Sequence, residues 1–103
     1  MRVTPEQLIV FKNLVSRYFG ADAELWLFGS RVDDSKKGGD YDFLIETSMN
    51  DADAIVAGKV DLIAALQNTL PFEDEKIDIV VKRRFSPFVM PIYEVAKSEG
   101  VRL

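Results

Sequence analysis

Acidic side chains interrupt two segments of the chain that otherwise have the composition of β-strands. Asp40 and Asp42 stand at the start of segment 41–46, and Asp78 stands inside segment 76–82. Side chains two positions apart in a strand point to the same face, so Asp40 and Asp42 share one small patch. Two such carboxylates repel each other unless a cation lies between them or one stays protonated. If the two segments form neighbouring strands, the three acids converge on a site for a divalent cation.

Each acid also has an ordinary explanation when it is considered alone. Asp40 and Asp42 can simply begin a strand in solvent after the polar turn "KKGGD", and Asp78 can lie on the exposed face of an edge strand between two lysines. In the interior of a sheet, an unpaired carboxylate at Asp78 would instead cost several kcal/mol. The combined pattern therefore favours a site, while each position by itself does not.

A second candidate motif follows the apolar segment 24–28. Gly29 lets the backbone approach an anion closely, and Ser30 offers a hydroxyl and an N–H at the start of a possible short helix. Arg31 adds positive charge for a phosphate oxygen. These residues predict a place for the phosphates of a nucleoside triphosphate, next to the Mg²⁺ or Mn²⁺ that the acids would bind. Asp78 would complete a second metal position and accept the proton of an attacking hydroxyl.

The composition narrows the chemistry further. The 103-residue chain contains no cysteine and no histidine, which excludes zinc sites, Ser-His-Asp triads and Cys-His dyads and leaves oxygen ligands for hard cations. Its formal net charge of −4 argues against direct binding to DNA. No apolar run has the length of a membrane span and no charged-then-apolar leader opens the sequence, so we expect a cytoplasmic protein.

Local patterns predict a single α+β domain over residues 1–103, with a three- to four-stranded mixed sheet and about three or four helices. β-Branched and aromatic residues predict strands at 24–28, 41–46 and 76–82, and residues 101–103 can add an edge strand. Capping residues and apolar spacing predict three helices: one from Thr4 to Gly20, one from about Ala52 to Thr69, and one from Pro87 or Pro91 to Gly100. The second helix has a predicted apolar stripe of Ile55, Val56, Val60, Ile63 and Leu66.

Taken together, "GSR" at 29–31, "DYD" nine residues later and "IDIVV" downstream resemble the minimal nucleotidyltransferase proteins of the DNA polymerase beta superfamily, antitoxin type. The resemblance covers nearly the whole chain. It implies that Gly29 and Ser30 hold triphosphate, that Asp40 and Asp42 bind divalent metal, and that Asp78 is the third acid of the site.

The resemblance also implies a biological role that no spacing could show. Many such proteins are antitoxins encoded beside an all-helical HEPN-type partner, and some transfer AMP from ATP to a tyrosine of that partner. The alternative is a non-catalytic antitoxin or assembly module that binds its helical partner, with a nucleotide-binding or vestigial pocket.

Two features depart from the family pattern. Val32, Asp33 and Asp34 stand where a second arginine and a glycine are common, and the chain lacks the extra helical domain that covers the nucleotide in larger relatives. We therefore expect a partner chain or a second copy to complete the site.

Overall fold

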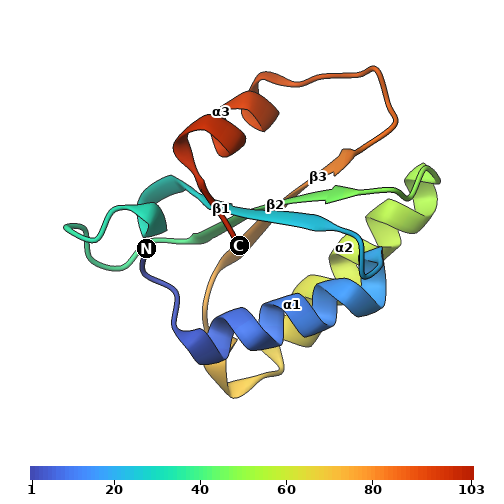
Figure 1. Cartoon of the computed structure of the whole chain (residues 1–103). Coiled ribbons are helices and arrows are strands. Elements are labelled where there is room, and N and C mark those ends of the chain that lie inside the picture. The colour runs from blue at the N-terminus through green and yellow to red at the C-terminus, as the bar shows by residue number, and fades with distance from the viewer.

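The computed structural model describes residues 1–103, and its centre is a four-stranded mixed sheet with helices on both faces (Figure 1). The strand order is β3-β2-β1-β4, in which β1 runs antiparallel to β2 and β4 while β2 runs parallel to β3. Helices α1 and α2 cover one face of the sheet and α3 covers the other. The strands are β1 (Glu24–Phe28), β2 (Tyr41–Thr47), β3 (Ile77–Arg83) and β4 (Val101–Arg102).

The helices begin and end at capping residues. Thr4 and Gln7 form a reciprocal capping box at the start of α1 (Pro5–Phe19), and Gly20 ends this helix at φ 97°. Asp51 accepts hydrogen bonds from the first turn of α2 (Ala52–Gln67). The last helix, α3 (Pro91–Glu99), starts at Pro91 rather than Pro87. None of these helices has both the length and the hydropathy that crossing a membrane requires.

The alternation of side chains along the strands divides the apolar residues between the two faces. The larger cluster lies between the sheet and α1 and α2, where the rings of Phe11 and Phe43 stack with centroids 3.8 Å apart. The smaller cluster lies under α3. It consists of Trp26, Leu44, Tyr93 and Ala96. Even-numbered residues of β2 therefore face α3, and odd-numbered ones face the main core.

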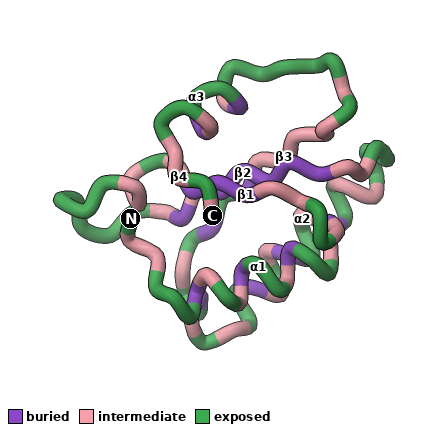
Figure 2. The backbone as a smooth tube through the Cα atoms, in the orientation of Figure 1, coloured by how far each residue is buried: buried purple, intermediate pink, exposed green.

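The structure confirms the predicted α+β class. Of the apolar stripe predicted for α2, Ile55, Ile63 and Leu66 pack in the main core, but Val56 and Val60 do not. Val56 and Val60 are each 63% exposed, whereas Gly58 and Leu62 point inward. A Cβ atom on Gly58 would lie 3.3 Å from the ring of Phe19, so the glycine allows α1 and α2 to approach closely at this point. This contact turns Val56 and Val60 outward. The tube in Figure 2 is likewise exposed along residues 87–90, which precede α3.

Candidate functional site

The sheet register brings the predicted acids to one end of the sheet. Asp42 pairs with Asp78 across the parallel β2–β3 ladder, and Asp40 precedes β2 by one residue. Burial, followed by the negative charges of Asp78 and Asp40, raises the pKa of Asp42 above its ordinary value. The site therefore carries unbalanced negative charge next to a partly buried carboxylate, on the face of the sheet that α3 covers.

Asp78 and Asp40 are both accessible from solvent. Asp78 is exposed because β3 is an edge strand, so the expected penalty for a buried carboxylate does not arise at this position. The Asp40 carboxylate lies 3.6 Å from the ammonium of Lys76, in a pair whose side chains are 44% and 79% exposed. Such an exposed ion pair contributes little free energy.

The donor atoms fit a hard cation, although the side chains are not gathered around one. No group of three or more acidic side chains is close enough to hold a metal ion in this structure. The ligands available are carboxylate oxygens, which suit Mg²⁺ and Mn²⁺. Burial is the main reason that the pKa of Asp42 is raised, and a cation between the acids would relieve the second one, the repulsion from Asp78 and Asp40.

The Gly29-Ser30 turn adjoins the acids directly. Gly29 has φ 76°, and a Cβ atom there would lie 2.3 Å from Oδ2 of Asp42. Gly39 has φ 91°, and its Cβ would lie 2.2 Å from Oγ of Ser30. Both positions require glycine, because the backbone conformation and the close approach each exclude a side chain. The short 3₁₀ turn η1 (Gly29–Val32) thus packs against the segment that carries the acids.

Arg31 is not brought together with the acids. Its guanidinium lies over the ring of Tyr41 at 4.0 Å, and its Nε donates to the carbonyl of Gly39 at 3.2 Å. It also lies 3.9 Å from the carboxylate of Glu75. Tyr41 faces the main core, so Arg31 lies on the side of β2 opposite to Asp42. In this structure its visible role is to hold the loop against β2.

Arg2 is a residue of this site that the sequence patterns did not indicate. Its backbone N–H donates to the carbonyl of Arg31 at 2.7 Å. Its guanidinium donates to three more carbonyls of the same loop, those of Ser30 (2.8 Å), Asp33 (2.9 Å) and Gly38 (2.7 Å). Arg2 therefore fixes both ends of the loop that contains Ser30. No local signal could reveal this, because the acceptors are backbone atoms about thirty positions away.

Replacing Arg2 with alanine is expected to loosen this loop without unfolding the domain. Hydrogen exchange of the amides of Asp33 and Lys36 should accelerate about tenfold or more, because local opening no longer breaks three side-chain bonds. R2K should restore little, since an ammonium lacks the planar fork of donors. The exposed Lys12→Ala is the control. Unchanged exchange in R2A would contradict the assignment.

The comparison with known proteins decides the family. Residues 8–100 match the family model described as nucleotidyltransferase domain, a span that includes the Gly29-Ser30 turn and all three acids. The chain belongs to the nucleotidyltransferase domain family. No curated protein matches the chain.

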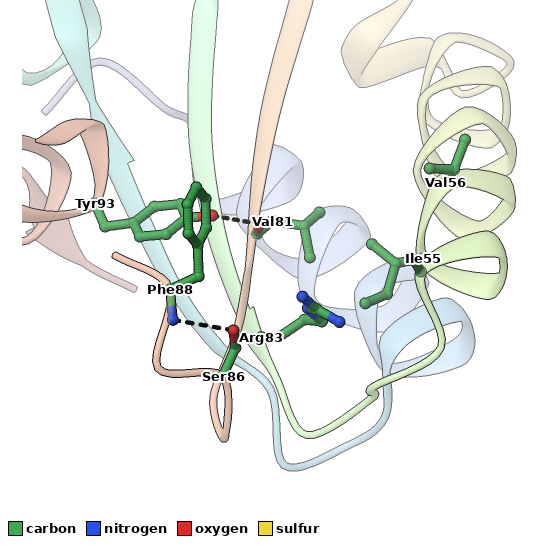
Figure 3. A pocket seen from close by; sticks show the side chains of 8 residues that line it. Ile55, Val56, Val81, Arg83, Ser86, Phe88 and Tyr93 are labelled. Atoms are coloured by element: carbon green, nitrogen blue, oxygen red, sulfur yellow. Dashed lines mark hydrogen bonds between the residues drawn. The ribbon is translucent and has the colours of Figure 1, made fainter. Parts of the chain in front are cut away.

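The acid end of this nucleotidyltransferase domain is open. None of the surface pockets is lined by Asp40, Asp42 or Asp78. The one lined mostly by apolar side chains near α3, of about 200 Å³, lies at the other end of β3, around Val81 and Phe88 (Figure 3). The domain thus presents its acids on a surface rather than in a cleft.

Proposed function

We propose that this nucleotidyltransferase domain transfers a nucleoside monophosphate, AMP from ATP, to a hydroxyl acceptor. The observation that carries the proposal is the pairing of Asp42 with Asp78 beside the Gly29-Ser30 turn, within a chain of this family. The carboxyl of Asp42, whose pKa is raised, lies beside a second carboxylate and a tight, glycine-dependent turn, an arrangement suited to metal and triphosphate together.

The residues divide the work according to their positions. Ser30 and the backbone at Gly29 bind the triphosphate, while Asp40, Asp42 and Asp78 hold Mg²⁺ or Mn²⁺. The bound cation supplies neutralisation of the charge that develops on the phosphates. Asp78 is exposed, so an acceptor hydroxyl can reach it from solvent, and it takes the hydroxyl proton.

The proposed transfer accounts for every bond that forms or breaks and for the proton. The acceptor oxygen forms a bond to the α-phosphorus of ATP, and the bond from that phosphorus to the oxygen bridging to the β-phosphate breaks. Pyrophosphate leaves with the electron pair of that bond, and the hydroxyl proton moves to the carboxylate of Asp78.

The finer proposal concerns the acceptor and the biological role. We propose a tyrosine of a HEPN-type helical protein as the acceptor, with this domain acting as its antitoxin. The open acid surface supports a macromolecular acceptor, because a partner chain can cover the nucleotide that this small domain leaves exposed.

A second candidate function is a non-catalytic antitoxin that binds the same kind of partner. It is favoured by two observations: Arg31 is occupied by Tyr41 and Gly39, and the acids are not gathered as metal ligands. In that case the association with the partner should survive both a chelator and Asp40→Asn.

Label transfer from ATP tests the proposed reaction. The protein is incubated with Mg²⁺ and its helical neighbour-encoded protein, in parallel with ATP labelled at the α- or the γ-phosphate. We expect the acceptor to gain the α-label only, pyrophosphate to appear, and a chelator to stop both. Transfer of the γ-label would indicate phosphoryl transfer instead. Tight binding of the partner without any label would favour the non-catalytic function.

A further inference from the structure

The outer edge of β3 has unused backbone hydrogen-bonding groups. Two bonds at the ends of the β2–β3 ladder, from Tyr41 N–H to the carbonyl of Lys76 and from Arg84 N–H to the carbonyl of Thr47, show that even-numbered residues of β3 bond to β2. The N–H and C=O groups of Ile79 and Val81 therefore point away from the sheet. Only the carbonyl of Val81 has a partner, the Tyr93 hydroxyl at 3.4 Å.

The charges along this edge are arranged for an antiparallel copy of the same strand. If a second copy pairs with Val80 opposite Val80, Ile79 lies opposite Val81 of the second copy and exchanges both backbone bonds with it. The same register places Asp78 opposite Lys82 of the second copy. Shifting the register by four residues would instead place Asp78 opposite Asp78, with two like charges facing each other.

The end of β3 that carries Lys82 has more positive than negative charge. Lys82 and Lys97 both bind the single carboxylate of Glu46, at 3.0 Å and 3.2 Å. One positive charge in this cluster is therefore not balanced. At the other end, Asp78 and Asp42 form an excess of negative charge. A two-fold axis at Val80 places the excess positive charge of each copy next to the excess negative charge of the other copy. The dimer therefore contains this contact twice.

Exposed apolar side chains flank the edge on both faces of the sheet. Figure 3 shows Val56 of α2 on one side of β3 and Phe88 on the other, around the same pocket. Val56 is 63% exposed and Phe88 is 62% exposed. In a monomer, exposed apolar residues beside an unpaired strand edge favour aggregation. When the edge pairs with another strand, the same residues can be buried in the interface.

We propose that this edge is a homodimer interface, in which two copies join β3 to β3 antiparallel around Val80 and form one continuous eight-stranded sheet. The backbone groups of Ile79 and Val81 supply the ladder, the Asp78–Lys82 pairs set its register, and the apolar flanks close it on both faces. The contact needs neither ATP nor a partner protein, but Asp78 belongs both to it and to the proposed transfer site. The two experiments that follow measure dimerisation alone and do not depend on transfer.

Cysteine trapping tests the register in a chain that has no cysteine of its own. In the proposed pairing the two Val80 residues form a non-hydrogen-bonded pair with Cα atoms about 4.5 Å apart, a separation that a disulfide spans. V80C should therefore form a covalent dimer within minutes under mild oxidation. L70C is the matched control, since Leu70 is 83% exposed and lies outside β3. Equal cross-linking of V80C and L70C would overturn the proposal.

Sedimentation tests the apolar flanks in the unmodified chain. At about 100 µM the wild type should have close to twice the monomer mass of 11.6 kDa. V56E and F88E should return it to the monomer mass, and both should fold because these positions are exposed. I9E, at a position 61% exposed on α1, should remain dimeric. A monomeric wild type, or a dimer unaffected by V56E and F88E, would overturn the proposal.

Discussion

Asp42→Asn is expected to lower nucleotidyl transfer by about 10³-fold while making the folded domain more stable. The loss of activity follows from the removal of a proposed oxygen ligand, the carboxylate that pairs with Asp78 across the β2–β3 ladder. The gain in stability follows from the raised pKa of Asp42, whose causes are burial and then the charges of Asp78 and Asp40. Steady-state transfer of α-label and thermal unfolding without divalent cation measure the two effects.

The sign of the stability effect depends on pH. A carboxyl whose folded-state pKa is raised contributes stability below its unfolded pKa, near 3.8, and loses that contribution as the pH rises through the folded value. D42N should therefore melt above the wild type at pH 8 and close to it at pH 3.5. The exposed Asp61→Asn on α2 is the control for a neutral change. Retained transfer in D42N would exclude Asp42 as a catalytic group.

Glu46→Gln is expected to destabilise the domain by about 3 kcal/mol, as the loss of one member of a buried ion cluster does. The Glu46 side chain is 9% exposed, and it is the shared carboxylate of Lys82, which is 13% exposed, and Lys97. An amide in its place leaves two ammonium groups beside each other with no counter-charge. Chemical denaturation of E46Q against the exposed Glu99→Gln measures the difference.

The cluster of Glu46, Lys82 and Lys97 also predicts that the stability of the folded domain falls at acid pH. Burial raises the pKa of Glu46, but the hydrogen bonds and charges of Lys82 and Lys97 outweigh it, so the pKa lies below its ordinary value of 4.5. A group with a lowered pKa contributes stability above its unfolded value and loses it as the pH falls through the folded value. Wild-type stability should therefore drop below about pH 4.5, and E46Q should lack this part of the drop. If the stability of the wild type and of E46Q fell equally below this pH, Glu46 would not have this role.

Signals within a few residues were sufficient for the elements themselves. The capping box of Thr4 and Gln7, the helix-ending Gly20 and Gly100, and the β-branched segments 41–46 and 76–82 predicted helices and strands that the structure contains. The alternation of side chains in a strand also accounts for the position of Tyr41 in the main core and of Asp42 on the other face. These features are local because hydrogen bonds of caps and the alternation of a strand involve only neighbouring residues.

Contacts between distant segments decided the rest of the site. Only the parallel pairing of β2 with β3 places Asp42 beside Asp78, and only the packing of the loop on Tyr41 turns Arg31 away from the acids. Arg2 acts through carbonyls of a loop about thirty residues away, and side-chain type gives no sign of such acceptors.

The acids of the site could be predicted from the sequence, whereas the exposed strand edge and the apolar residues beside it could not. The sequence by itself determined that Asp40, Asp42 and Asp78 are available as oxygen ligands, because residue type and strand alternation are properties of the chain. The tertiary structure alone decided that β3 is an edge strand and that Val56 faces outward, since strand order and the close approach of α1 and α2 at Gly58 arise from packing of distant segments.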